Sequence, residues 1–271
     1  MKKYLKFIVI CILFYIFLFL NNEWITISNY EYESEKVPKA FDGFKITQVS
    51  DLHDAEFGNN HERLVRKVQG TEPDVIFITG DLIDSRRYDL PQSLRAVEQL
   101  TKIAPVYYVL GNHEVATNEM NSIYDALENI GVHILKNEAT VFEKAGQSIV
   151  IAGLEDPLMG KSVEAMLNIA TKNVSNEHMS LVLSHRPEQF NAYVEHGVDL
   201  VFTGHAHGGQ IRLPFIGGLV APSQGWLPTY TDGIFSDAGT TMVISRGLGN
   251  SLFPFRIFNR PEIVQVQLKS K

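Results

Sequence analysis

Five short apolar runs recur along the chain, and each is followed at once by polar side chains. The runs are FKITQVS (44–50), DVIFITG (74–80), PVYYVLG (105–111), MSLVLS (179–184) and VDLVFTG (198–204). Their length and their β-branched and aromatic content are typical of strands, and their nearly continuous apolar character indicates burial on both faces. The residues that follow them are Asp51, Asp81, Asn112, His185 and His205. Each predicted strand therefore delivers a polar side chain at its carboxyl end.

The spacing of the first three clusters predicts strand–helix–strand units. Asp51 and Asp81 are 30 residues apart, and Asp81 and Asn112 are 31 apart, which is enough for a strand, a helix and a return. The intervening segment 60–69 has apolar residues at helical spacing. In sheets of this kind, the carboxyl ends of the strands gather at one edge. We therefore expect an α/β domain in which the five clusters converge on one site.

The remaining pattern indicates one domain with an N-terminal extension. Three further segments, 149–153, 241–245 and 263–268, also read as strands and are expected to complete a second sheet. No internal repeat, low-complexity tract or linker follows about residue 42, so a single domain over 43–271 is the simplest interpretation. The polar residues 23–42 are expected to form a juxtamembrane spacer.

Residues 1–22 are expected to be a single-pass membrane anchor. Three lysines precede the uncharged run 7–20, and acidic residues follow it. This asymmetry predicts a cytoplasmic N-terminus and a catalytic domain on the extracytoplasmic side. The run has 14 residues, fewer than the roughly 20 that span a bilayer, but flanking aromatic and aliphatic residues extend it. A signal peptide is the alternative, although no clear A-x-A-like cleavage site follows.

Charge and cysteine content narrow the candidate chemistry. The net charge is -7 and no long basic block occurs, so a nucleic-acid partner is not expected. The single cysteine, Cys11, lies within the apolar N-terminal run, which removes disulfides and thiolate metal sites from consideration. Oxygen and nitrogen ligands remain.

The polar clusters contain seven side chains of the kinds that bind metal ions. They are Asp51, His53, Asp81, Asn112, His185, His205 and His207. Carboxylate, amide and imidazole donors without sulfur suit Mn, Fe, Co or Zn. Seven donors exceed the need of one ion, so the sequence predicts two divalent ions that share a carboxylate. Such a pair stabilises in-line displacement at phosphorus, and phosphoester hydrolysis is the reaction that we expect.

The motifs occur in an order that resembles the calcineurin-like metallophosphoesterases. They are DLH (51–53), GDLID (80–84), GNHE (111–114), SH (184–185) and GHAH (204–207). The stretches GHAHGGQIRLPFIGGLVAP and SRGLGNS resemble a membrane-associated bacterial branch that includes YkuE and YaeI. The resemblance covers roughly residues 44–268. It implies a four-layer α/β/β/α sandwich.

The same resemblance implies a role for each motif residue. One ion would bind Asp51, His53, Asp81 and His207, and the other would bind Asp81, Asn112, His185 and His205, with Asp81 as the bridge. His113 would face the substrate and protonate or stabilise the leaving oxygen, while Asp84 would orient its imidazole. A carboxylate at one ring nitrogen leaves the other nitrogen free for general acid catalysis.

Other polar residues near the motifs have less specific patterns. Four histidines lack partner spacing and are expected at the surface, although His61 could approach the site: His61, His133, His178 and His196. Asp54 and Glu56 either support the ligands from behind or lie in a solvated loop, and the loop is the expected interpretation. The same two interpretations apply to Glu114, and Arg212 is a candidate contact for a phosphate. The glycines before the ligands, 80, 111 and 204, are expected where the chain turns sharply after a strand.

The loop 208–223 is rich in glycine and in apolar residues. It is either a hairpin packed on the core or an apolar rim that receives a lipid tail. With the predicted anchor, the second interpretation favours a phosphodiesterase or pyrophosphatase that acts on a lipid or cell-envelope phosphate. The family resemblance makes a UDP-diacylglucosamine-type pyrophosphate a candidate substrate.

Three other functions would use some of the same residues or chemistry. A phosphomonoesterase or protein phosphatase would use the same ligands, so the motifs do not separate it from a diesterase. An inactive metal-binding sensor or scaffold would be expected to lack a ligand or the leaving-group histidine, and this chain retains both. A metalloprotease is not supported, because the chain has no H-E-x-x-H motif.

Overall fold

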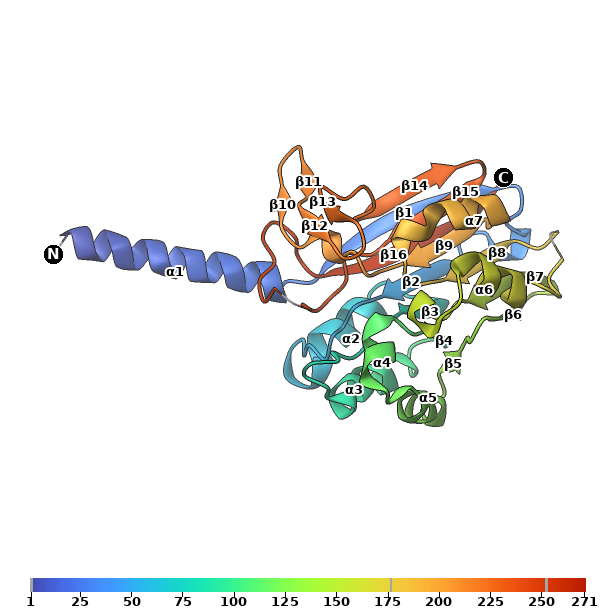
Figure 1. Ribbon diagram of the computed structural model, residues 1–271, viewed down its shortest axis with the longest axis horizontal. Coiled ribbons are helices and arrows are strands. Elements are labelled where there is room, and N and C mark those ends of the chain that lie inside the picture. The colour runs from blue at the N-terminus through green and yellow to red at the C-terminus, as the bar shows by residue number, and fades with distance from the viewer. Residues whose placement is uncertain (1, 176, 252) are drawn as a thin grey trace.

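Two six-stranded sheets form the centre of the molecule (Figure 1). The computed structural model describes residues 2–175, 177–251 and 253–271. The first sheet has the order β1 (Thr26–Ser34), β16 (Glu262–Ser270), β2 (Lys45–Val49), β3 (Val75–Thr79), β4 (Val106–Val109), β5 (His133–Ile134). The second has the order β14 (Gly233–Asp237), β15 (Thr240–Ile244), β9 (Leu200–Thr203), β8 (Ser180–Leu183), β7 (Gln147–Gly153), β6 (Glu138–Lys144). Both sheets are largely parallel at the centre.

Three apolar clusters divide the domain into four layers. Phe44, directly before β2, and Phe77 of β3 pack with Phe202 of the second sheet in a cluster between the sheets. Helices α2 (Glu62–Gln69), α3 (Leu90–Leu100), α4 (Asn112–Thr117) and α5 (Met120–Asn129) accompany the first sheet, and α6 (Val163–Ala170) and α7 (Phe190–His196) accompany the second. Apolar residues of these helices complete the two outer clusters. The predicted four-layer α/β/β/α sandwich is confirmed.

The strands form where the apolar runs predict them, because both of their faces are covered. Every residue of β3 is buried, and β4 and β9 are buried along their full length. Strand β3 pairs in parallel with β2 on one side and with β4 on the other, so consecutive strand–helix–strand units lie side by side in the sheet. Their carboxyl ends therefore lie at one edge of the sheet, as the spacing predicts.

Two expectations about the ends of the chain are wrong. Within the expected spacer 23–42, residues Thr26–Ser34 form β1, which pairs in parallel with β16 along its whole length. The first sheet therefore begins at Thr26. The strand predicted at 263–268, which is β16, lies in this sheet between β1 and β2 and not in the second one. These pairings join residues more than 200 positions apart, so no local pattern reveals them.

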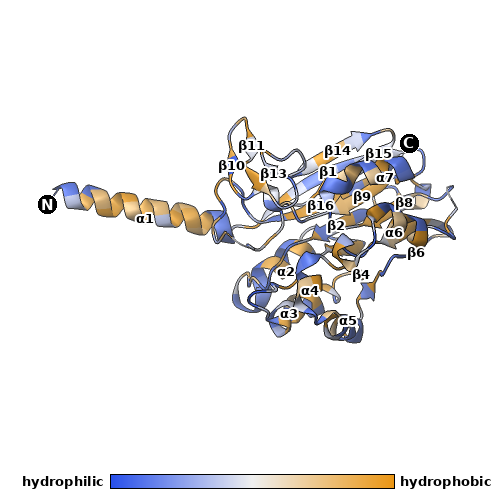
Figure 2. Ribbon diagram, viewed as in Figure 1, coloured by the Kyte–Doolittle hydropathy of each residue, from blue (hydrophilic) through white to orange (hydrophobic). Residues whose placement is uncertain are grey.

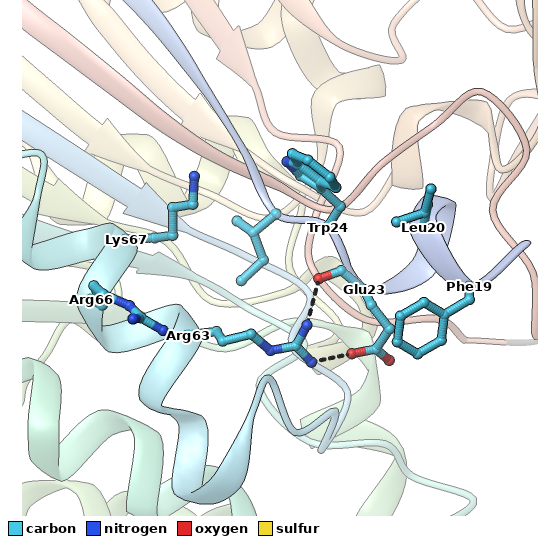
Figure 3. A pocket seen from close by; sticks show the side chains of 8 residues that line it. Phe19, Leu20, Glu23, Trp24, Arg63, Arg66 and Lys67 are labelled. Carbon is cyan, nitrogen blue, oxygen red and sulfur yellow. Dashed lines mark hydrogen bonds and ion pairs between the residues drawn. The ribbon is translucent and has the colours of Figure 1, made fainter. Parts of the chain in front are cut away.

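Helix α1 (Lys2–Glu23) extends away from the domain and is apolar along most of its length (Figure 2). It is long and apolar enough to cross a membrane, by length and composition. Its last turn is held against the domain: Arg63 donates to the Glu23 carboxylate at 2.5 Å and to its carbonyl at 3.4 Å (Figure 3). Asn250 donates to the Asn22 side chain at 2.8 Å. The helix therefore has a defined position at its domain end.

Strand β1 should contribute substantially to stability. A fragment that begins at Trp24 keeps Ile25, which is buried in the outer core, and the pairing with β16. A fragment that begins at Glu35 loses both. We expect the shorter fragment to lose more than about 3 kcal/mol of unfolding free energy, the cost of removing large buried side chains. Chemical denaturation measures this difference; equal midpoints would contradict the assignment of β1 to the domain.

Candidate metal centre

The loops after five strands bring the predicted ligands together where the two sheets meet. Asp51 and His53 follow β2, Asp81 follows β3, Asn112 begins α4 after β4, His185 follows β8, and His205 and His207 follow β9. Six of the seven side chains are buried, and Asn112 is partly exposed. Contacts cross between the sheets, since the His205 N–H donates to Asp51 at 3.1 Å. The centre thus combines both halves of the sandwich.

The ligand atoms fall into two groups that share Asp81. Candidate atoms of Asp51, His53, Asp81 and His207 lie within 4.8 Å of one another, and so do those of Asp81, His185 and His205. His53 Nε2 is 3.1 Å from His207 Nε2, and His205 Nδ1 is 3.2 Å from His185 Nε2. His185 Nε2 is 3.2 Å from Asp81 Oδ2. The grouping coincides with the division that the family resemblance implies.

The polar atoms of this centre fit a pair of metal ions. Among the described residues, the Asn112 side-chain oxygen and His53 Nδ1 are buried without a hydrogen-bond partner. Buried polar atoms in proteins nearly always have partners. The Asn112 oxygen is the predicted ligand atom, so its lack of a partner is explained if an ion completes it. The oxygen and imidazole donors suit a borderline divalent ion.

Five of the candidate ligands have left-handed backbone conformations. Their φ angles are between 48° and 65°: Asp51, His53, Asp81, His205 and His207. Such conformations cost about 1–2 kcal/mol for residues with a Cβ atom and are concentrated at functional sites. The conformation turns each side chain into the site directly after its strand ends. The sequence gives no signal of this strain.

The glycines that precede the ligands serve two different purposes. Gly80 has a φ of 87°, a conformation that glycine adopts readily. Gly111 and Gly204 do not have positive φ; a Cβ at Gly111 would collide with Asp81, and one at Gly204 would collide with Ser50 and Asp51. The expected sharp turn therefore applies to Gly80, whereas the other two allow close approach of backbone to ligands.

Glu114 supports the shared carboxylate from behind. Its side chain accepts hydrogen bonds from the main-chain N–H groups of Asp81 at 3.0 Å, Leu82 at 2.6 Å and Gly111 at 2.7 Å. Burial and the charge of Asp81 raise the pKa of Glu114 to about 7. This carboxylate joins the loops after β3 and β4. In the sequence, the only indication of this role is that Glu114 directly follows His113 in the GNHE motif.

The electrostatics of the centre favour one protonated histidine. Burial lowers the pKa of His185, but the charge and hydrogen bond of Asp81 outweigh it and raise this pKa to about 10. Burial lowers the pKa of His53 to about 3 and the pKa values of His205 and His207 well below their usual range. Burial also raises the pKa of Asp51 to about 6. In the absence of metal, His185 is therefore the charge partner of Asp81.

His113 lies beside the ligands, and its hydrogen-bond partners differ from the expected ones. The Ser85 N–H donates to His113 Nδ1 at 3.1 Å, and Ser251 Oγ is 3.1 Å from Nε2. Asp84 Oδ1 is 3.6 Å from Nδ1, which is beyond hydrogen-bond distance. Asp84 instead accepts from Arg86 N–H and from the Arg87 guanidinium. It therefore fixes the turn that carries Ser85.

Several expectations about neighbouring residues are wrong. His61 is fully buried and contacts the Gln92 carbonyl at 3.0 Å, and His196 is half-buried, whereas His133 and His178 are exposed as predicted. Asp54 is half-buried and does not lie in an open loop, since it accepts from Ser93 Oγ at 2.7 Å and from the Asp84 N–H at 2.9 Å. Glu56 is exposed as expected. The hydrogen bonds of His61 and Asp54 join residues 30 to 39 positions apart, so the local sequence does not predict them.

Two buried arginines that the sequence analysis missed flank the ligand histidines. Arg186 Nη1 is 2.8 Å from His205 Nε2, and its guanidinium pairs with Asp156 at 2.5 Å. Arg256 is 1% exposed, and its Nη2 is 3.5 Å from His207 Nδ1. Arg212, which could have contacted a phosphate, pairs with Asp232 at 2.7 Å instead. Isolated arginines have no diagnostic spacing, so the sequence could not single them out.

Comparisons with known proteins agree with this geometry. The calcineurin-like phosphoesterase family model matches residues 44–209. The metallophosphoesterase YkuE of Bacillus subtilis is 31% identical over 261 residues, which cover 93% of this chain and 88% of YkuE. The phosphodiesterase YaeI of Escherichia coli is 29% identical over 83% of this chain and 82% of YaeI.

A solved structure supports the fold at greater distance. The crystal structure of TT1561 from Thermus thermophilus has a TM-score of 0.52 with 13% identity, over 76% of this chain and 90% of that one. At this identity the likeness concerns the fold alone. The family match and the relatives at about 30% identity decide the classification. The chain belongs to the calcineurin-like phosphoesterase family and is a hydrolase.

Proposed function

We propose that the chain is a two-metal phosphodiesterase or pyrophosphatase whose substrate carries a lipid or cell-envelope group. The observation that carries the proposal is the position of Asp81 in both ligand groups. One ion would bind Asp51, His53, Asp81 and His207, and the other would bind Asp81, Asn112, His185 and His205. The identity of the ions, Mn, Fe, Zn or Co, is left to metal analysis.

When bound, the ions supply a nucleophilic water and neutralise charge on the phosphate oxygens. The protein's own contribution to leaving-group departure would come from His113. Because the Ser85 N–H donates to Nδ1, the proton of the neutral ring lies on Nε2. Ser251 Oγ is 3.1 Å from this nitrogen. As a general acid the ring must carry a proton on both nitrogens; Ser85 Oγ, 3.2 Å from Nδ1, would then accept from Nδ1–H while the Nε2 proton passes to the leaving oxygen and leaves the ring neutral. Asp84 acts as a positioning residue through the turn at Ser85.

The lipid part of the proposal is supported by the surface near helix α1. Residues 1–22 would anchor the chain, with the catalytic domain on the extracytoplasmic side. Phe215 is fully exposed and Ile216 is 61% exposed at the tip of the hairpin β10 (Arg212–Leu213)–β11 (Gly217–Gly218). This tip is solvated, so core packing does not explain its apolar residues. The phosphodiesterase name of the relative YaeI supports a diester substrate.

A comparison of substrates tests the reaction. We expect metal-loaded protein to hydrolyse a phosphodiester or a lipid pyrophosphate faster than a phosphomonoester. Preference for the monoester would favour a phosphomonoesterase or protein phosphatase of the same family. Inactivity on all three would favour a metal-binding sensor or scaffold.

Replacement of His113 tests the leaving-group role. His113→Ala should lower turnover by about 10²–10⁴-fold, the usual contribution of a general acid, while metal content stays unchanged. The loss should be smaller for a diester with a more acidic leaving group, because such a group needs less protonation. His178→Ala is the matched control, since His178 is exposed on the surface. Uniform losses for all leaving groups would refute the general acid role.

Metal affinity should rise with pH. Asp81 raises the pKa of His185 to about 10 in the absence of metal, so this imidazole is protonated at neutral pH and must release its proton to become a ligand. Calorimetric titration in buffers of different ionisation enthalpy should detect proton release. The affinity should increase as the pH is raised from 6 to about 9. An affinity that is independent of pH would contradict this assignment.

The exposed hairpin tip should matter for lipid substrates. Phe215→Ser combined with Ile216→Ser should lower the ratio of lipid-diester to soluble-diester hydrolysis, because the apolar contact area is lost. The control is Val141→Ser, which removes a 56% exposed apolar residue of β6. Equal losses on both substrates would refute the lipid-binding rim.

A further inference from the structure

A cavity of about 440 Å³ separates helix α1 from the loops of the metal centre. One wall is formed by the last turns of α1, with Tyr15, Leu18 and Phe19. The opposite wall includes Phe57 and Phe255. Its volume lies in the range of small-molecule sites. The cavity lies between an apolar helix of membrane-spanning length and the candidate metal centre, which is where the apolar part of a lipid substrate would lie.

If α1 spans a membrane, the cavity beside its last turns would lie near the surface of the bilayer. The apolar run 7–20 has 14 residues and spans about 21 Å, whereas the hydrocarbon core of a bilayer is about 30 Å thick. Phe258 of the domain packs on Phe17 of α1 with ring centroids 5.2 Å apart. Phe255 and Phe258 are 42% and 58% exposed. These exposed aromatic residues continue the apolar surface of α1 onto the domain, so this part of the domain would lie in the bilayer interface if α1 spans the membrane.

The opposite wall is continuous with the catalytic loops. The Leu248 N–H donates to the Ser50 carbonyl at 3.0 Å, and the Gly249 N–H donates to the Asp51 carbonyl at 2.7 Å. Both Leu248 and Gly249 line the cavity. Ser251, two residues beyond, contacts His113. A molecule in the cavity therefore touches the segment that holds a candidate ligand and approaches the proposed general acid.

Helix α2 presents positive charge beside the same end of α1. Arg63, Arg66 and Lys67 line an adjacent pocket with Phe19 and Trp24 (Figure 3). Arg63 pairs with Glu23, whereas the exposed Arg66 and Lys67 side chains are at the height where lipid phosphates lie if α1 spans the membrane. Basic residues next to an apolar surface are typical of an interfacial membrane contact.

We propose that the cavity between α1 and the catalytic loops binds an acyl chain of the lipid substrate, which extends from the bilayer along Leu18 and Phe19 while its phosphate reaches the metal centre. The inference rests on the proposed function and adds the part of the substrate that is recognised. Aromatic and aliphatic side chains supply the apolar contacts, and four polar residues complete the lining: Asn22, Glu23, Glu56 and Asn250.

Photocrosslinking of the full-length protein in lipid nanodiscs tests the site. The probe is a phosphatidylglycerol with a diazirine in the middle of one acyl chain. We expect crosslinks in the segments 55–57 and 254–255 in addition to α1. Leu18→Trp, which fills the cavity from the helix side, should lower the yield in both segments several-fold. Leu13→Trp is the matched control, since Leu13 is 60% exposed on α1 and does not line the cavity.

Crosslinks confined to α1, or equal yields in the two tryptophan variants, would overturn the acyl-chain site. Hydrolysis of a soluble diester by the wild-type protein is measured in parallel and requires no lipid. Hydrolysis without domain crosslinks would overturn this site alone. Crosslinks without hydrolysis of either a diester or a lipid pyrophosphate would overturn the proposed function instead.

Discussion

The structure depends on holding two buried carboxylates among four buried histidines at the junction of two sheets. Asp51 and Asp81 are 0% and 1% exposed, and buried charge is costly unless it is compensated. Main-chain N–H groups of His205 and His113 donate to them at 3.1 and 2.8 Å. Protonated His185, 3.2 Å from Asp81, compensates part of this charge in the absence of metal, and two divalent ions would compensate both carboxylates. The left-handed backbone at five candidate ligands is tolerated because the surrounding contacts hold it in place.

Local pattern was sufficient to predict an α/β domain whose strand ends bring the candidate ligand residues to one site, whereas the four-layer sandwich followed from the family resemblance. Buried parallel strands are recognised by their apolar runs, and their carboxyl ends must meet at one edge. Contacts that depend on distant parts of the chain were not predictable. The pairing of β1 with β16, the burial of His61, and the approach of Arg186 and Arg256 to the ligands all arise from tertiary packing. The sequence also did not reveal that the Ser85 N–H, and not Asp84, is hydrogen-bonded to His113 Nδ1.

The N-terminal helix is structurally part of the enzyme and not a separate tether. Asn22 and Glu23 are hydrogen-bonded to the domain, and the chain enters β1 three residues after the helix ends. If α1 spans a membrane, as proposed, a junction of this kind would fix the height and tilt of the candidate metal centre relative to the bilayer. A soluble substrate would gain nothing from this constraint, whereas a phosphate that stays in the bilayer interface would be presented at a fixed distance.

The central claim is that Asp81 joins two ions in one site, and metal analysis of the purified full-length protein tests it most directly. After loading with Mn²⁺ and removal of free metal, the wild-type chain should retain two ions. Asp81→Asn should lose both to a large extent, while Asp125→Asn, which changes an exposed acid on α5, should retain two. A single ion in the wild-type protein, or two tightly bound ions in Asp81→Asn, would contradict the account.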